Sequence, residues 1–211
     1  MSVVTFFLHH RSEIWQAVLE HVWLVGATML FAAVIGIPLG ILVARRPWLS
    51  KPILGSANIA ETIPSLALFG FLLPVPWLGG RADRLAITAL TLYALLPIIR
   101  NTSEGIRGVD PAVRESARAM GMTEWQILTQ VELPLSLSTV LAGVRIATVL
   151  TIGIATIAAA VGAGGLGEFI FRGLAMVNDQ LILAGAIPAA MLAIVADLGL
   201  GLLERRLRPI R

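Results

Sequence analysis

Residues 110–134 read DPAVRESARAMGMTEWQILTQVELP, a polar and charged stretch that lies between two long apolar segments. Asp110 is a favourable N-cap for a helix, and Pro111 suits the first helical position because its missing N–H would have no intrahelical partner there. Gly121 ends this helix, since glycine tolerates left-handed backbone angles. The first half of the stretch therefore predicts a short helix that stops at a glycine elbow.

A second short helix is expected directly after the elbow. Thr123 and Gln126, three residues apart, match a capping box, in which each side chain bonds the other residue's backbone N–H. This helix runs into Leu133 and Pro134, where the next apolar segment begins. On pattern alone, a plain amphipathic hairpin at a membrane surface and a hairpin that docks a partner are both open interpretations.

The composition is that of a membrane protein rather than a soluble domain. Hydrophobic residues make up 57% of the chain and charged residues 14%, with a mean hydropathy of +0.85. Soluble proteins average about 45–50% apolar and about 25% charged residues. The net charge of +3 comes from basic residues between the apolar segments, which does not indicate nucleic-acid binding. Disulfides are excluded because the chain has no cysteine.

Five apolar segments reach, or nearly reach, the roughly 20 residues that cross a bilayer core. They cover about residues 22–43, 53–73, 85–99, 135–161 and 181–203. The expected fold is all-α: a single polytopic membrane domain over residues 1–211, with five transmembrane helices and the helix–Gly–helix loop at 110–134. An odd number of spans places the two termini on opposite sides.

Lysine and arginine are unevenly distributed between the two sets of loops, and cytoplasmic loops normally carry the excess. One set holds eleven of them, Arg45, Arg46, Lys51, Arg100, Arg107, Arg114, Arg118, Arg205, Arg206, Arg208 and Arg211. The other set holds four, Arg11, Arg81, Arg84 and Arg172. This distribution predicts an outside N-terminus, a cytoplasmic C-terminus and a cytoplasmic 110–134 loop.

The loop also contains a spaced motif. Glu115-Ser116-Ala117 is followed after three residues by Gly121, and after nine more by Val131, Glu132 and Leu133-Pro134. This pattern resembles the EAA loop of the permeases of binding-protein-dependent ABC importers, with Ser116 in place of the first Ala of Glu-Ala-Ala. Four further stretches are similar to permease subunits of glycine betaine/carnitine/choline (osmoprotectant) importers: ETIPSLA at 61–67, YALLPI at 93–98, GAGGLG at 162–167 and AGAIPA at 184–189.

The resemblance implies a type I importer permease fold in the cytoplasmic (inner) membrane. It implies that the first loop helix docks on a cytoplasmic ATPase subunit, through Arg114, Glu115, Ser116, Ala117, Met120 and Gly121. The partners implied are two ATP-binding subunits per complex, a second identical or homologous permease subunit, an external substrate-binding protein and the lipid bilayer. The substrate implied is a quaternary-ammonium osmolyte such as glycine betaine, carnitine or choline.

Several polar residues lie inside the apolar segments, where ionisable groups are costly and must face protein or water. The candidates for a transport pathway or gate are Glu61, Thr62, Pro64, Ser65, Arg145 and Asp197. Arg145, Asp197 and Glu61 lie at similar depths by helix rise, which predicts that Arg145 pairs with one or both acids. A structural polar contact at Glu61 and an Arg145 that snorkels to the surface are the alternatives.

No catalytic, cofactor or metal site is predicted. The sequence has no GxxxxGK[ST] phosphate loop, so ATP hydrolysis is expected on a separate chain. The glycine motif at 162–167 follows a membrane segment rather than a strand, which excludes a dinucleotide site and favours a tight turn. His9, His10 and His21 have no zinc-ligand spacing and are expected at the surface.

Three functions other than osmolyte import are the alternatives. One is an ABC importer permease for another small polar solute. Another is an ion-coupled secondary transporter, for which Glu61 and Asp197 are the only intramembrane carboxylates available. A membrane-embedded enzyme is disfavoured, because no intramembrane His or Cys is expected.

Overall fold

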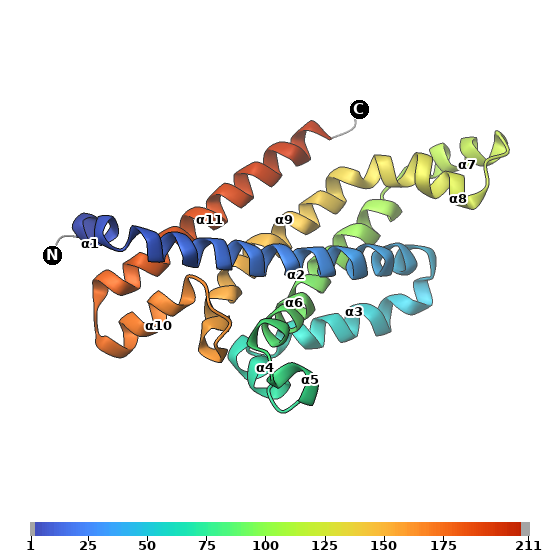
Figure 1. The fold of residues 1–211 in the computed structure, drawn as a ribbon. Coiled ribbons are helices and arrows are strands. Elements are labelled where there is room, and N and C mark those ends of the chain that lie inside the picture. Colours follow the sequence, from blue (N-terminus) through green and yellow to red (C-terminus); the bar gives the residue numbers. More distant parts are fainter. Residues whose placement is uncertain (1–2, 208–211) are drawn as a thin grey trace.

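The computed structural model describes residues 3–207, and every regular element in that range is a helix (Figure 1). Arg208 and Arg211, which contribute to the charge count above, lie outside the described residues. Four helical stretches in this range are long and apolar enough to cross a membrane. They are α2 (Arg11–Arg45), α6 (Ala82–Arg107), the stretch Glu124–Val161 that contains α9 (Leu133–Ala158), and α11 (Asp179–Arg206).

These four helices confirm four of the predicted spans, although each helix is longer than its apolar segment. α2 begins at Arg11 rather than near residue 22, and α6 continues to Arg107 rather than ending near residue 99. Polar residues at the ends of a spanning helix lower the hydropathy without breaking the helix. The sequence estimate is therefore too short at both ends of α2, α6 and α11, and at the N-terminal end of the Glu124–Val161 stretch.

The predicted single span at 53–73 is wrong as a continuous helix. The chain instead forms α3 (Pro47–Thr62) and α4 (Ser65–Leu72), with extended backbone at Ile63 and Pro64 between them. Proline disfavours helical angles in the residue before it, so Ile63 takes ψ 128°. The buried Tyr93 hydroxyl of α6 donates a hydrogen bond to the Ile63 carbonyl, which the break has freed from its helical partner.

Helix α6 is the centre of the bundle and packs mainly against α2 and α9. Of its most apolar stretch 61% is buried, compared with 28% for α2 and 17% for α11. Gly36 and Gly40 of α2 let α2 and α6 approach closely, because a Cβ at Gly40 would lie 2.5 Å from the Thr102 side chain of α6. Small residues at this spacing allow such contacts between membrane helices.

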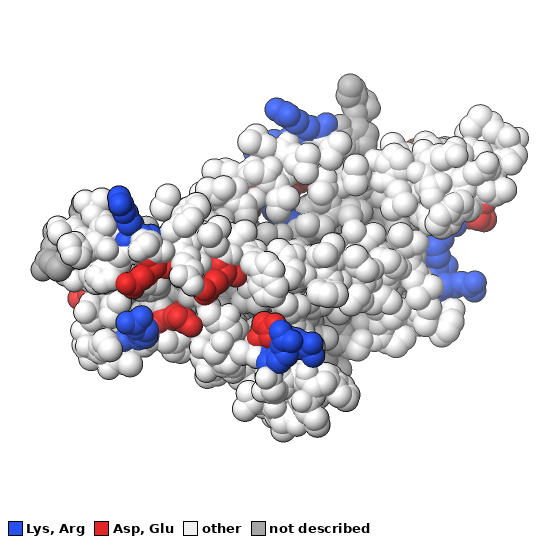
Figure 2. Space-filling view, viewed as in Figure 1, with Lys and Arg blue, Asp and Glu red and all other residues white. Residues whose placement is uncertain are grey.

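The molecule is elongated, and different helices lie at its two ends. α1 (Val3–His9) and α10 (Gly167–Met176) lie at one end, and the last turn of α2 lies at the other (Figure 1). A four-residue helix, α5 (Pro76–Gly79), leads into α6. On the face shown in Figure 2, the surface over the middle of α2 carries no charged side chain. Leu30, Phe31, Val34 and Ile35, in the middle of α2, are exposed, as on a helix that contacts lipid.

The expectation that His21 is a surface residue is wrong. His21 lies inside α2 and is fully buried, with Nε2 3.1 Å from the Ile152 carbonyl oxygen. The glycine loop at 162–167 covers it: Gly164 and Gly165 have φ near +79°, and the Gly165 N–H donates to Glu20. The tight turn predicted for these glycines is confirmed, and a Cβ on Gly165 would meet the His21 ring at 3.2 Å.

Candidate functional site

The 110–134 stretch forms the predicted helix, elbow and second helix. The Asp110 carboxylate accepts a hydrogen bond from the Ala112 N–H, which caps α7 (Pro111–Ala119). Gly121 has φ +81°, in the left-handed region. Thr123 and Gln126 make both bonds of the capping box at the start of α8 (Glu124–Gln126). A π-helical segment, Ile127–Glu132, then joins α8 to α9 without a break.

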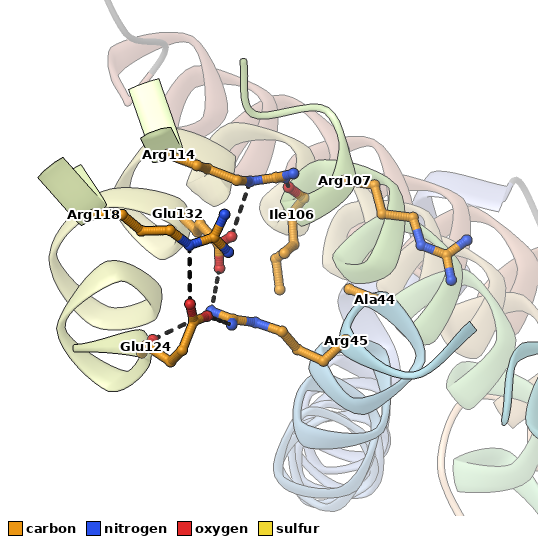
Figure 3. A pocket seen from close by; sticks show the side chains of 8 residues that line it. All are labelled: Ala44, Arg45, Ile106, Arg107, Arg114, Arg118, Glu124 and Glu132. Carbon is orange, nitrogen blue, oxygen red and sulfur yellow. Dashed lines mark hydrogen bonds and ion pairs between the residues drawn. The ribbon is translucent and has the colours of Figure 1, made fainter. Parts of the chain in front are cut away.

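The side chains that the resemblance assigns to ATPase docking fall into two groups. Glu115, Ser116 and Met120 are exposed on α7, and 75% of Met120 is accessible. Ala117 is buried and Arg114 points back towards the bundle (Figure 3). These two residues hold α7 in place and do not form part of its exposed surface. The elbow at Gly121 is exposed between the two helices.

Apolar side chains are also exposed on this loop, although the loop is polar in composition. Val113 is 41% exposed, Met120 75% and Trp125 70%. Trp125 was not among the predicted site residues, and its signal in the sequence is an aromatic residue directly after a helix cap. Exposed aromatic and methionine side chains are typical of the core of a protein interface.

A cluster of ion pairs ties the loop to the end of α2 (Figure 3). Arg45 of α2 donates from Nη1 to Glu124 at 2.5 Å and from Nη2 to Glu132 at 2.7 Å. Arg114 pairs with the other Glu132 oxygen at 3.0 Å, and Arg118 pairs with Glu124 at 3.1 Å. Five charged side chains from α2, α7, α8 and the π segment therefore form one network.

The same side chains line a hollow of about 330 Å³ between the ends of α2 and α6 and the loop. Arg107 and Ile106 of α6 lie on its other side, and the Arg107 guanidinium donates to the Val43 carbonyl at 2.6 Å. Arg114 also donates to the Ile106 carbonyl. The loop is thus held both by ion pairs to α2 and by a hydrogen bond to the end of α6.

The second group of charges lies between α9 and α11. Arg145 makes a bidentate contact with Asp197, at 2.6 Å from Nε and 2.8 Å from Nη2, and Nη1 lies 3.3 Å from Glu204. The predicted pairing of Arg145 with Asp197 is confirmed. The described residues include no ion pair between Arg145 and Glu61, so Glu204 is the second acid. Gly201 leaves room for the guanidinium, since a Cβ there would lie 3.1 Å from Nη1.

The polar residues at 61–65 surround the break between α3 and α4. Glu61 and Ser65 are half-buried, whereas Thr62 and Pro64 are exposed. The Thr62 hydroxyl donates to the Ile59 carbonyl within α3, so it is satisfied locally. Within residues 3–207 no ion pair links these residues to Arg145, and their place in a pathway stays a prediction. Among residues 3–207, no group of three or more His, Cys, Asp or Glu residues has metal-binding geometry.

Comparison with solved structures shows the fold. The chain superposes on a subunit of the MetNI methionine ABC transporter in an inward-facing conformation with a TM-score of 0.84, at 24% identity, over 93% of this chain and 96% of that one. It also superposes on a chain of a bacterial alginate ABC transporter, solved with an alginate-bound periplasmic protein, with a TM-score of 0.69 at 18% identity.

Comparison with curated proteins shows the family. The chain is 47% identical to the glycine betaine/carnitine/choline transport system permease protein OpuCD of Bacillus subtilis, over 98% of this chain and 90% of that protein. It is 42% identical to the carnitine transport permease protein OpuCB of Listeria monocytogenes, over 99% and 94%. Because residues 36–209 also match the family model, the chain belongs to the inner membrane components of binding-protein-dependent transport systems.

Proposed function

We propose that this chain is the transmembrane subunit of an ATP-driven importer for a quaternary-ammonium osmolyte: glycine betaine, carnitine or choline. The support for the substrate is the naming of relatives that are 42% and 47% identical over at least 98% of this chain. An external binding protein delivers the solute, and the selective recognition of the cation takes place there.

The observation that carries the transport proposal is the exposed loop at one end of the bundle. Helix α7 presents Glu115, Ser116 and Met120, while Ala117 and Arg114 anchor it to the spans. In this proposal α7 is the coupling helix, and it docks on one of two ATPase subunits in the complex. ATP binding and hydrolysis then move α7, and the anchored spans follow.

The proposed topology has five crossings. At 1.5 Å per residue, α3 is about 24 Å long and α4 about 12 Å, so together they exceed the roughly 30 Å of a bilayer core. The break at Ile63 and Pro64 would then lie within the membrane. The excess of basic residues beside α7 supports a cytoplasmic loop and C-terminus, and an outside N-terminus.

A second permease subunit, identical or homologous, completes the pathway in this proposal. Most of α11 is not covered within one chain, since only 17% of its most apolar stretch is buried. The Arg145–Asp197 pair is also partly accessible, with side-chain exposures of 34% and 41%. Charged groups at that depth cannot face hydrocarbon, so we place them, with Glu61 to Ser65, beside the pathway or its gate.

The test is reconstitution in liposomes with the cognate ATPase and binding protein. Uptake of radiolabelled glycine betaine, carnitine and choline is measured with ATP and with a non-hydrolysable analogue. We expect uptake of at least one of them only with ATP and binding protein. Uptake of a different polar solute in place of these three, under the same conditions, would show that the substrate assignment is wrong. Uptake driven by an ion gradient without the ATPase would instead support a secondary transporter.

A further inference from the structure

Glu132 is the least accessible charged side chain of the loop network. Only 5% of its side chain is exposed, whereas Glu124 in the same network is 59% exposed. One Glu132 oxygen pairs with Arg45 at 2.7 Å and the other with Arg114 at 3.0 Å. A carboxylate buried to this extent requires charged partners, because without them its negative charge is buried without compensation.

The three paired residues come from three different elements. Arg45 is the last residue of α2, Arg114 lies in the middle of α7, and Glu132 ends the π segment that continues into α9. Short π segments are frequent at functional sites because the wider turn shifts the helical register. Here Ile127 and Leu128 of that segment are buried, and Glu132 faces the two arginines (Figure 3).

We propose that Glu132 is a positioning residue that holds α7 against both α2 and α9, so that the three helices move as one unit. Without Glu132, α7 keeps the Arg114–Ile106 hydrogen bond and the Arg118–Glu124 ion pair, and its chain connections are the Gly108–Asp110 linker and the glycine elbow. Neither is a rigid link, because each contains a glycine outside a helix. The inference rests on the proposed function only in that it calls α7 the coupling helix.

Hydrogen exchange of the assembled transporter in lipid nanodiscs tests the proposal. In Glu132→Gln, we expect faster exchange in residues 111–126 and unchanged exchange in residues 162–180 at the other end of the molecule. The glutamine keeps the size of the side chain and removes its charge. The matched control is Asp83→Asn, which removes the acid of the exposed Arg81–Asp83 pair and should leave residues 111–126 unchanged.

A double variant tests whether Arg45 acts through Glu132. Because Arg45 also pairs with Glu124, Arg45→Gln combined with Glu132→Gln should exchange faster in residues 111–126 than Glu132→Gln alone, but by less than the sum of the two single effects. Three results would overturn the proposal: unchanged exchange in residues 111–126, an equal rise in residues 162–180, or additive effects in the double variant. The second of these would show a general loss of stability rather than a local one.

Hydrolysis measurements separate this inference from the proposed function. In Glu132→Gln, we expect the stimulation of ATP hydrolysis by the loaded binding protein to fall, with the unstimulated rate retained. If exchange rises in residues 111–126 while hydrolysis and uptake stay coupled, the positioning role of Glu132 stands and the coupling role of α7 fails. If exchange is unchanged and coupling is normal, the positioning role fails and the proposed function stands.

Discussion

The Arg145 side chain brings a positive charge into a membrane helix, and two acids of α11 neutralise it. That Arg145 pairs with an acid of a span was predictable because charges in spans are few. Helix depth left Asp197 and Glu61 both open, and it did not point to Glu204. The pairing of Arg45 with Glu132, 87 residues apart, was not predictable. Loops contain many charges of both signs, and a single sequence does not say which of them meet.

Removing both members of the Arg145–Asp197 pair should impair the transporter by less than the two single losses added together. We expect Arg145→Gln and Asp197→Asn each to lower ATP-driven uptake and the apparent melting temperature. Arg145→Gln removes the shared partner of Asp197 and Glu204, and Asp197→Asn removes the bidentate partner of Arg145 and leaves it with Glu204. The double variant should lose less than the sum of the two losses. Additive losses would indicate that the two residues act independently. Arg172→Gln, on exposed α10, is the control for loss of an arginine charge.

At Gly121 the backbone angle alone determines which residues are tolerated. A Cβ there would meet no atom within 4 Å, so a substitution strains the left-handed conformation and nothing else. Gly121→Val should leave membrane insertion intact and uncouple ATP hydrolysis from uptake, since left-handed angles cost an ordinary residue about 1–2 kcal/mol. Asparagine tolerates these angles, so Gly121→Asn should retain coupling. Coupled uptake at the normal rate in Gly121→Val would contradict the importance of the elbow.

At the scale of single elements, α7 and α8 were predictable because their signals are local. Asp110, Gly121 and the Thr123–Gln126 pair act within a few residues of their own positions. The break after α3 was not predictable in the same way. Pro38, Pro52, Pro97 and Pro188 all lie inside continuous helices of this chain, so a proline does not by itself stop a helix. At Pro64 the preceding residue is extended, and the Tyr93 hydroxyl donates to the Ile63 carbonyl that the break frees.

That contact can be tested by removing a single oxygen atom. Tyr93→Phe leaves the Ile63 carbonyl without its hydrogen-bond donor in a buried setting, which typically costs about 1–3 kcal/mol. We expect a lower apparent melting temperature in detergent for this variant. The control is Thr62→Val at the same break, where the hydroxyl only bonds within its own exposed turn and the loss should be smaller. Equal effects of the two variants would show that the Tyr93 hydroxyl does not stabilise the break.

At the scale of the whole molecule, α6 is long enough for its ends to lie on opposite sides of the membrane, as the proposed topology has them. Its 26 residues extend about 39 Å, which exceeds a bilayer core of roughly 30 Å. Gly80 lies just before α6 and Gly108 just after it. The C-terminal end of α6, next to Gly108, lies beside Arg45 and the ion-pair network of the 110–134 loop, where basic residues are concentrated. The charge distribution therefore predicts that the Gly108 end is cytoplasmic.

Cysteine labelling tests this orientation cleanly, because the chain has no cysteine of its own. A Cβ fits freely at Gly80, where the nearest atom lies at 4.0 Å, and tightly at Gly108, where the Glu104 carbonyl oxygen lies at 3.1 Å; a Cβ on Gly79 would meet a backbone oxygen at 1.8 Å. In intact cells, a membrane-impermeant maleimide should label Gly80→Cys and not Gly108→Cys. After permeabilisation it should label both, which controls for accessibility. The opposite pattern in intact cells would place α7 outside the cell, where no ATP-hydrolysing partner could reach it, and the coupling proposal would fail with the topology.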